Sequence, residues 1–525
     1  MIVWQAYMPT IFLLQLNFAF LVSTIAICGI VSYAAEYSPF RSFFKRNTLV
    51  TYLKPIMSVI MLGSFIGLTE NVWHYYIYSI GAANIFVSND SLLLCDWVFF
   101  SNNPGMRIYK INLFTTMRSL DGYTVFGLSF FNFSIDFFGI ILLFLSYVVG
   151  FISLLALDSR LYWKNFRYIY TFNIFVIIVY LYVTTNNILL FFLYYEFLLL
   201  PSFLFVYFVS PSRRAIQASI YFVIWTQLGS FLVLTAVSYI VYSVGSSEFD
   251  VIRRHVFTSN EVWVLYTLLF FGFGFKVPIW PFHYWLTKTH VEAPSGFSIY
   301  LSGFLVKSAL YGFYKISTLL NVEINTSIFI LITLLGVFDS SLKMWGQTDI
   351  KKLVAYGTIQ EMNLIFLIFC WGDSSIIVAG IIFTATHAFL SSLMFYLVDC
   401  VYRRFHTRSI VEINGILHIT PNLGVCILIM TVFFAGLPGT IKFISEFYIF
   451  SSFMEISPFT CIVLMLTANV IGLVGFSKVW FNLVFGGYTK NTKYLPMDLS
   501  YKEIYIVCFN FFILVYLAYM PIVFF

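Results

Sequence analysis

Charged residues are scarce in this chain. Lys, Arg, Asp and Glu make up 10% of the 525 residues, whereas hydrophobic residues make up 60%. Soluble domains carry about 25% charged residues. This composition excludes a separate soluble catalytic domain and indicates a polytopic membrane protein. The first ten residues also lack a basic segment, so we expect no cleaved signal peptide and insertion through the first apolar run.

Cofactor and metal motifs are missing as well. No close pair occurs among the seven cysteines, which are Cys28, Cys95, Cys370, Cys400, Cys426, Cys461 and Cys508. Iron-sulfur and zinc sites need such pairs, and a nicotinamide site needs a G-x-G-x-x-G sequence that this chain lacks. We therefore expect neither a cofactor-binding site nor a metal site in this chain.

Apolar windows of about 20 residues predict an all-α polytopic protein with about fourteen membrane-spanning helices. The spans are expected near 11-33, 55-80, 135-156, 168-185, 188-209, 218-242, 262-285, 296-319, 325-345, 352-371, 375-398, 422-452, 459-483 and 504-524. They divide the chain into residues 1–133 with two helices and a polar segment, a core at 134–420, two further helices at 421–485, and a last loop and helix at 486–525. Basic residues gather in the loops that follow odd-numbered spans, which places those loops on the inner side of the membrane and both termini outside.

The region from Gly272 to Lys307 contains charge where a membrane helix must break. Lys276 lies in an apolar run and is followed by Pro278 and Pro281, which cannot continue a helix. A cation at bilayer depth costs about 2.5 to 3.5 kcal/mol, and freed backbone groups need partners inside the protein. The pattern therefore predicts a functional site. His283, His290 and Glu292 are expected in a short polar connection, before the second buried lysine, Lys307.

Three further spans carry a titratable residue near their middle. Glu196 must meet a partner or take up a proton, and Lys276 is the natural partner. The pair is interpreted as a switch, or as a permanent ion pair that fixes two helices. Glu361 belongs to an interface or to a proton pathway. His387 can pass a proton near neutral pH or remain a hydrogen-bonded core histidine.

The twelfth span repeats the pattern of the seventh. Gly436, Pro438 and Gly439 interrupt it before Lys442 and Glu446. Interrupted helices in corresponding positions are typical of inverted repeats, here two repeats of about five helices with breaks in helices 7 and 12. Lys442 and Glu446 are also four residues apart, so mutual neutralisation is the alternative.

Two other charged positions are interpreted as structural. Asp136 stands at the start of the third span, where a carboxylate favours the helix dipole, and is expected to cap that helix. Asp339 and Lys343 are four residues apart and are expected to form an ion pair on one helical face.

Six segments carry a family resemblance over residues 134–485. They are LYYEFLLLP, FKVPIWPFHYWLTKTHVEAP, GFLVKSALYGFYKI, QTDIKKLVAYGTIQEM, TATHAFLSSLMFY and LPGTIKFISEF. In this order they resemble the chain 4 family of antiporter-like membrane subunits of respiratory NADH:ubiquinone oxidoreductase (complex I). The family usually has a histidine where this chain has Glu361.

The resemblance implies a proton-translocating membrane-arm subunit of complex I. It assigns a proton path to Glu196, Lys276, Lys307, His387 and Glu446. The sequence itself offers Glu361, His283, His290 and Lys442 as further relay candidates. It also implies that FMN, iron-sulfur clusters, NADH and ubiquinone bind elsewhere in the complex, so this chain performs no redox chemistry itself.

The implied setting is the mitochondrial inner membrane. Expected partners are the other membrane-arm subunits, including neighbouring antiporter-like subunits, and lipids such as cardiolipin, with no nucleic acid. The alternatives are a subunit of a multi-chain Na⁺(K⁺)/H⁺ antiporter of the Mrp type, which uses the same fold, and a membrane-arm scaffold whose charges only hold helices together.

Overall fold

The structure, a computed structural model, describes residues 136–156, 162–209, 212–320, 325–372, 374–486 and 497–519. The predicted first two spans and the polar segment to residue 133 lie outside these ranges. Within them the chain forms helices and no strands, so the all-α prediction is confirmed for this part of the protein. The predicted total of about fourteen spans extends beyond the described residues.

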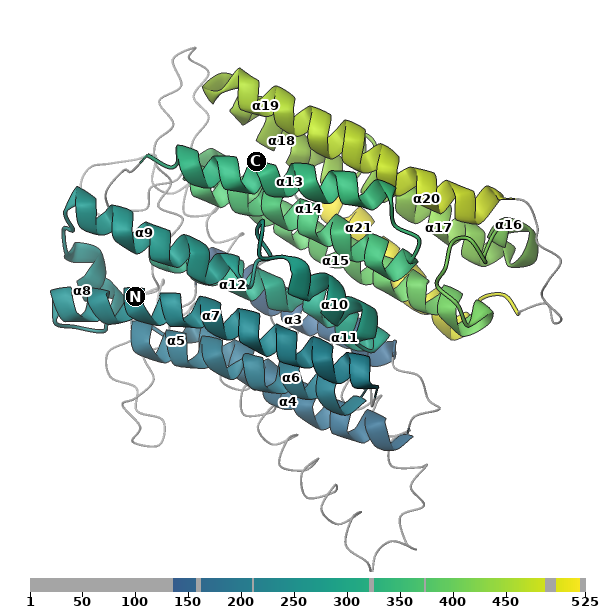
Figure 1. Ribbon diagram of the computed structural model, residues 1–525, viewed down its shortest axis with the longest axis horizontal. Coiled ribbons are helices and arrows are strands. Elements are labelled where there is room, and N and C mark those ends of the chain that lie inside the picture. The colour runs from purple at the N-terminus through teal and green to yellow at the C-terminus, as the bar shows by residue number, and fades with distance from the viewer. Residues whose placement is uncertain are drawn as a thin grey trace, which may run out of the picture.

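The helices run side by side in a bundle (Figure 1). Its first part contains α3 (Phe137–Leu155), α4 (Tyr162–Thr184), α5 (Ile188–Phe197), α6 (Leu199–Val209), α7 (Arg213–Val244), α8 (Phe249–Arg254), α9 (Ser259–Gly274), α10 (Tyr284–Glu292), α11 (Ser295–Tyr300), the π-helix η1 (Leu301–Leu305) and α12 (Val306–Ser317). Local capping fixes several of these boundaries. Asn187, for example, accepts hydrogen bonds from two backbone N–H groups at the start of α5.

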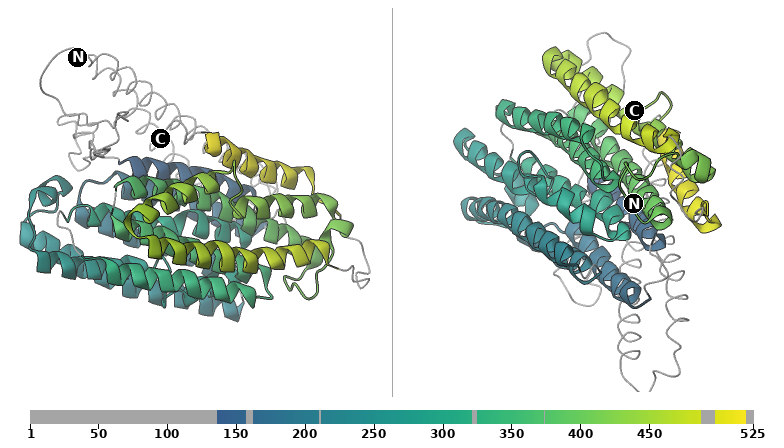
Figure 2. Two further views of the ribbon diagram at one scale, coloured as in Figure 1. Left: turned by 90° about the horizontal axis from the view of Figure 1, so that it is seen from above. Right: turned by 45° about the vertical axis from the view of Figure 1, so that its right-hand side comes forward.

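The second part of the bundle contains α13 (Ser327–Trp345), α14 (Ile350–Trp371), α15 (Ser374–Phe405), α16 (Ile416–Ile419), α17 (Pro421–Phe434), α18 (Ile441–Ile456), α19 (Pro458–Leu464), the π-helix η2 (Met465–Gly472), α20 (Leu473–Phe485) and α21 (Tyr501–Tyr519). The long helix α15 is central, since it packs against α3, α11, α14, α17, α18 and α21. Figure 1 and the right-hand view of Figure 2 show α17 to α20 along one side of the bundle and α4 to α7 along the opposite side.

Both predicted helix breaks are present. The seventh span is divided into α9 and α10 by residues 275–283, and the twelfth into α17 and α18 by residues 435–440. The first break begins just before Lys276, so this lysine lies within the irregular segment. Gly436 and Gly439 have φ angles of 66° and 96°, which glycine adopts without steric cost.

Side chains satisfy carbonyl groups that the breaks release. The indole Nε1 of Trp285 donates to the carbonyl of Phe275 at 2.8 Å, and the Lys442 ammonium donates to the carbonyl of Phe434 at 2.7 Å. Within the bilayer such groups have no water to bind, so these bonds make irregular backbone possible there.

A second feature recurs in the span after each break. The eighth span contains the π-helix η1 and the thirteenth contains η2. A broken helix followed by a π-containing helix thus occurs once in each half of the bundle, in agreement with the predicted repeat. Wide π turns are often found at functional sites because they displace neighbouring side chains and carbonyls.

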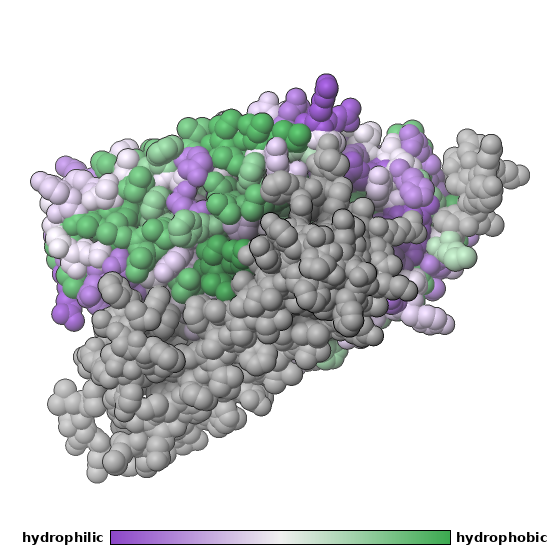
Figure 3. Space-filling model, turned by 90° about the horizontal axis from the view of Figure 1, so that it is seen from below, coloured by the Kyte–Doolittle hydropathy of each residue, from purple (hydrophilic) through white to green (hydrophobic). Residues whose placement is uncertain are grey.

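The bundle has the dimensions and surface of a membrane protein. Eight of the described helical segments are long and apolar enough to cross a bilayer, and shorter apolar helices accompany them. Figure 3 shows a broad hydrophobic area on the described surface, with hydrophilic residues mainly toward its ends. This distribution is the one expected of a protein embedded in lipid or in other membrane subunits.

Two local predictions need correction. His290 and Glu292 were expected in a connection but belong to the helix α10, because the chain resumes helical structure soon after Pro281. Asp136 flanks the start of α3, yet its side chain makes no capping hydrogen bond. Its carboxylate instead lies 3.6 Å from the Lys315 ammonium and accepts a hydrogen bond from the Tyr311 hydroxyl. A buried lysine competes more strongly for this carboxylate than the helix terminus does.

Candidate functional site

Glu196 and Lys276 lie near each other in the first half of the bundle without forming an ion pair. The half-buried Glu196 stands at the end of α5, where its carboxylate accepts a hydrogen bond of 3.0 Å from Gln227 on α7. Lys276 is only 3% exposed, and its ammonium lies 4.0 Å from the ring centroid of Tyr195. In the described part of the chain, the two charges therefore interact electrostatically without direct contact. Glu196 contacts the neutral Gln227, and Lys276 contacts the neutral Tyr195 ring.

Gln227 was not singled out in the sequence, although it is a polar residue in the middle of the long apolar helix α7. It holds Glu196 by its amide nitrogen, while its amide oxygen accepts a hydrogen bond from the Ser230 hydroxyl at 3.0 Å. This second bond fixes the amide orientation, so the NH₂ group faces the carboxylate. Its position as a polar residue deep inside an apolar span is the signal that could have identified it.

Lys307 is fully buried where η1 ends and α12 begins. Its ammonium donates to Nδ1 of His387 on α15 at 2.8 Å and also to the carbonyl of Ser302 within the π turn. Because an ammonium can only donate, Nδ1 must accept, which places the proton of a neutral imidazole on Nε2.

The Nε2 atom of His387 faces Glu361. It lies 3.7 Å from the Oε2 atom of that carboxylate, and neither atom has a hydrogen-bond partner among the described residues. Both residues are nearly inaccessible, with 1% and 4% exposure. A closure of a few tenths of an ångström would join them in a hydrogen bond.

Lys442 connects Glu361 to the second broken helix. Its ammonium lies 2.5 Å from Glu361 Oε1 and 3.7 Å from Oε1 of Glu446, one helical turn further along α18. The predicted contact between Lys442 and Glu446 is thus present, but Glu361 is the nearer partner. Lys307, His387, Glu361, Lys442 and Glu446 form one continuous series of buried charged or titratable groups.

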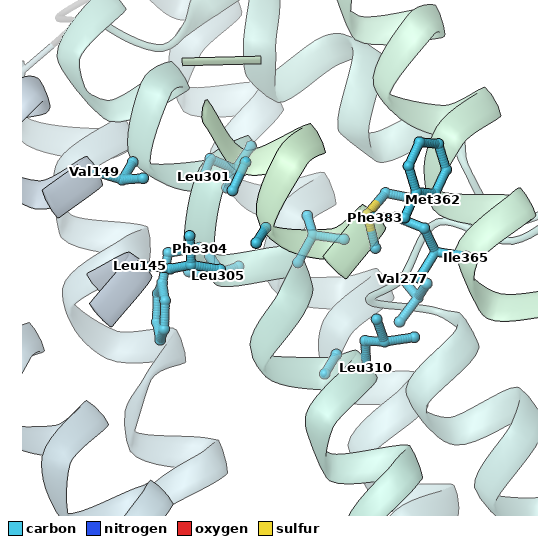
Figure 4. Close-up of a cluster of buried hydrophobic side chains, with 14 of the residues drawn as sticks. Leu145, Val149, Val277, Leu301, Phe304, Leu305, Leu310, Met362, Ile365 and Phe383 are labelled. Atoms are coloured by element: carbon cyan, nitrogen blue, oxygen red, sulfur yellow. The ribbon is translucent and has the colours of Figure 1, made fainter. Parts of the chain in front are cut away.

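This series crosses a packed apolar core. Figure 4 shows Leu305, Leu310, Met362, Ile365 and Phe383 in a buried hydrophobic cluster. In sequence, the two leucines flank Lys307, Met362 and Ile365 follow Glu361, and Phe383 stands one turn before His387. Such surroundings exclude bulk water, so the polar groups interact mainly with one another.

A small cavity lies at the far end of the series. It measures about 20 Å³ and is lined by Glu361, Lys442 and Glu446 together with Asn469 of η2. A cavity of about 10 to 15 Å³ with polar partners is enough to hold one water molecule. This site can therefore supply a water bridge between the two carboxylates.

The two histidines of the seventh span lie apart from this series. The Nε2 atom of His283 is 3.1 Å from the Lys343 ammonium and 3.4 Å from Asp339. Asp339 and Lys343 form the predicted ion pair at 2.6 Å. His290 is completely buried and stacks on Phe395 with a centroid distance of 4.5 Å, and its nitrogens have no hydrogen-bond partner in the described ranges.

Sequence reasoning missed a charged cluster at the C-terminal end of α15. Asp399 pairs with Arg403 and Glu503 pairs with Arg404, each at 2.5 Å. Their charges lie at the ends of predicted spans, where sequence alone does not distinguish a surface residue from a buried pair. The described residues contain no group of three or more His, Cys, Asp and Glu side chains arranged to hold a metal ion.

Comparisons with known proteins agree with this architecture. The profile of the family described as NADH:quinone oxidoreductase/Mrp antiporter, TM, matches residues 185–472. The NADH-ubiquinone oxidoreductase chain 4 of Paramecium tetraurelia is 46% identical over 390 residues, which cover 74% of this chain and 82% of the relative.

Two solved structures share the fold. A chain of respiratory complex I from Thermus thermophilus aligns with a TM-score of 0.67 at 20% identity, and a chain of the Mrp complex from Dietzia sp. DQ12-45-1b with a TM-score of 0.67 at 16% identity. Each alignment covers 74% of this chain and 82% of the other. The profile match and the Paramecium relative show that this chain belongs to the NADH:quinone oxidoreductase/Mrp antiporter family of transmembrane proteins, in its chain 4 group.

Proposed function

We propose that this chain is the chain 4 subunit of the proton-translocating NADH:ubiquinone oxidoreductase and moves protons through its series of buried charges. The observation that carries the proposal is the continuous contact from Lys307 through His387, Glu361 and Lys442 to Glu446. Each member can hold or pass a proton. Together they extend from the π turn of the eighth span to the second broken helix.

Glu196 and Lys276 serve as the switch at the start of this path. A carboxylate near an ammonium favours its charged form, whereas burial disfavours it. Because Lys276 is nearly inaccessible and lacks an ion-pair partner within 4.0 Å among the described residues, its proton depends on the distance to Glu196. Moving the two apart favours transfer of the Lys276 proton toward Lys307, His387 and then Glu446.

The energy scale is compatible with such small movements. Transfer of one charge against a membrane potential costs about 2.3 kcal/mol per 100 mV. Two charges about 4 Å apart attract each other by about 4 kcal/mol at the effective dielectric constant of 20 that suits such sites. A change in the distance between two buried charges therefore alters the free energy of a proton on the lysine by an amount of the required size.

The driving reaction takes place in partner subunits. We assign NADH, FMN, the iron-sulfur clusters and ubiquinone to those subunits, since the sequence contains no motif for any of them. The mitochondrial inner membrane is favoured as the location because the Paramecium relative is a NADH-ubiquinone oxidoreductase chain 4 from a eukaryote. The exposed apolar side chains of the bundle provide surfaces for neighbouring membrane-arm subunits and for lipids such as cardiolipin.

A subunit of an Mrp-type cation/proton antiporter is the second candidate. The TM-score to the Dietzia Mrp chain equals that to the Thermus complex I chain, so the fold alone does not distinguish the two functions. The 46% identity to a chain 4 favours complex I. Purification from native membranes separates the candidates, because only the complex I subunit is recovered with flavin- and iron-sulfur-containing chains.

The relay is tested by replacing Lys276 or Lys307 with alanine in the assembled complex. We expect intact assembly and a reduced number of protons translocated per NADH oxidised, measured in sealed vesicles. Lys288→Ala is the matched control, because Lys288 belongs to the same broken span but is exposed. An unchanged proton yield in both relay variants would reject the relay and favour a scaffold whose charges only hold helices together.

A further inference from the structure

Lys442 lies between two carboxylates that belong to different helices. Glu361 comes from α14, while Glu446 stands one turn beyond Lys442 on α18. The three side chains are only 4%, 7% and 9% exposed, in the order Glu361, Lys442, Glu446. The ammonium contacts Glu361 at 2.5 Å and Glu446 at 3.7 Å. One buried cation is thus within reach of two anions.

The surroundings favour a mobile ammonium. A lysine head group is a compact charge on a flexible four-carbon chain, so it can change partners without a backbone movement. The Phe434 carbonyl, at 2.7 Å, holds the ammonium beside both acids. Gly436 leaves room for Glu446, because a Cβ atom there would lie 3.1 Å from Glu446 Oε2.

Glu361 also has an unused site for a proton. Its Oε2 atom makes no hydrogen bond in the described part of the chain and faces His387, while its Oε1 atom binds Lys442. The Glu361 carboxylate therefore has one oxygen that faces His387, from which a proton can come, and one that contacts the Lys442 ammonium. The cavity of about 20 Å³ beside it reaches Glu446 and has room for one water molecule.

We propose that Lys442 is a mobile counter-ion that moves between Glu361 and Glu446, toward whichever carboxylate is negatively charged, as a proton crosses the second broken span. This inference rests on the proposed relay. It adds Lys442 as the positive charge that balances the negative charge of Glu361 or Glu446 in the last part of the relay. The family resemblance does not supply it, because chain 4 proteins usually have a histidine where Glu361 stands.

The proton balance of one cycle is closed. At the start Lys307 and Lys442 are positive, and Glu361 and Glu446 are negative. A proton passes from the Lys307 ammonium to Nδ1 of His387 while the Nε2 proton passes to Oε2 of Glu361. Neutral Glu361 releases Lys442, which moves toward Glu446.

Glu361 then gives its proton to Glu446 through water in the cavity, and Lys442 returns to the newly charged Glu361. The Nδ1 proton of His387 returns to Nε2, which restores the starting tautomer. Glu446 releases its proton to the outer side, and Lys307 takes up another. Lys442 stays protonated throughout, and the series remains neutral until Glu446 has its proton. One proton has crossed.

The test compares Lys442→Met and Glu361→Gln with Lys307→Ala in the assembled complex. We expect both variants to lower the protons translocated per NADH oxidised to the value of Lys307→Ala. Glu361→Gln keeps the shape of the side chain, so it remains informative if Lys442→Met fails to assemble. The matched control is Glu503→Gln, which breaks an equally short ion pair at the C-terminal end of α15 and should leave the proton yield unchanged.

Infrared difference spectra provide a signature that a purely structural pair would not give. The unmodified complex should show a protonated carboxylic acid appearing during turnover, and Glu361→Gln should remove this band. If Lys442→Met and Glu361→Gln pump normally while Lys307→Ala does not, the counter-ion role and the passage through Glu361 are wrong, and only a relay that runs from His387 to Glu446 without them stands. If Lys307→Ala also pumps normally, the proposed function itself fails.

Discussion

At the scale of single residues, this protein combines charges that a membrane interior normally excludes. Lys307 and His387 are completely or almost completely buried, and each compensates the other through a hydrogen bond of 2.8 Å. The bond also sets the tautomer of the imidazole, so one nitrogen accepts a proton and the other donates one. A structural histidine needs no such orientation, whereas a proton carrier does.

His387→Gln tests this orientation. Glutamine can accept a hydrogen bond from Lys307, but its amide cannot take up a proton at one atom and release another. We expect normal assembly and a loss of about 10²-fold or more in the proton transfer rate through this chain, the effect typical of removing a general acid or base. Time-resolved proton release from vesicles measures it, and a rate equal to that of the unmodified complex would contradict the assignment.

The Asp136–Lys315 pair makes a different prediction. Lys315 is 7% exposed and lies over the rings of Phe191 and Phe249 at 5.3 and 4.9 Å. Asp136→Asn removes its carboxylate and leaves a buried cation, which typically costs about 3 to 5 kcal/mol. The aromatic faces retain part of the attraction, so we expect about 2 to 3 kcal/mol.

Thermal dissociation of the purified complex would detect this loss. The exposed Glu248, in the loop after α7, provides the control, since Glu248→Gln should change stability by less than about 0.5 kcal/mol. Equal effects of the two replacements would indicate that the Asp136–Lys315 pair contributes nothing.

Residue identity alone indicated most residues of the candidate site, but not which of them contact each other. Lys276, Lys307, His387 and Glu446 stood out because charge is rare in apolar spans. The contact between Glu361 and Lys442 did not, since 81 residues separate them and no periodicity relates α14 to α18. Sequence spacing instead favoured Glu446 as the partner of Lys442, because neighbours on one helix are the only contacts that spacing can reveal.

At the scale of elements, close packing positions the breaks. The helices α7 and α9 approach each other at Gly229 and Gly272, where a Cβ on Gly229 would lie 2.5 Å from the Gly272 carbonyl oxygen. Small residues allow this approach, which is a frequent basis of helix association in membranes. Two residues before Gly229, Gln227 of α7 donates a hydrogen bond to Glu196 of α5.

Gly229→Val should separate α7 from α9. The added atoms meet backbone and the Phe275 side chain, so we expect a destabilisation of about 1 to 3 kcal/mol and a weaker Gln227–Glu196 contact. The thermal stability of the complex measures the first effect and the protons per NADH the second. Gly346→Ala is the control, because no atom lies within 4 Å of the position of its Cβ.

The ends of the helices were predictable where proline or glycine residues interrupt a helix. Pro278, Pro281, Gly436 and Gly439 predicted both breaks. The π turns η1 and η2 were not predictable, because their sequences, LSGFL and MLTANVIG, contain no residue type that forces an extra residue into a helical turn. Tertiary packing, and not local propensity, selects such turns.

At the scale of the whole molecule, α15 joins the proposed proton path to the rest of the bundle. It carries His387 in its middle and, at its C-terminal end, Arg404, which binds Glu503 on α21 at 2.5 Å. The last span is therefore attached to the same helix that holds the central histidine. Large apolar side chains remain exposed on α7, α13 and the α19–α20 segment, which leaves two sides of the bundle available to lipid or to other subunits.

Glu503→Gln should weaken the attachment of α21. Arg404 is 9% exposed at its side chain, so loss of its carboxylate partner should lower the midpoint of thermal dissociation by several degrees, corresponding to about 2 kcal/mol or more. Protons per NADH should stay constant in the complex that remains. A changed yield at unchanged stability would mean that this pair belongs to the proton path.

The two broken helices respond differently to a change of charge. The free carbonyl at the first break is held by the indole of Trp285, which stays neutral at every physiological pH, while that at the second is held by the ammonium of Lys442. We therefore expect the contact at the first break to be independent of charge. The contact at the second break should change with the charge of the acids around Lys442, so the two halves of the bundle differ in their sensitivity to the same proton.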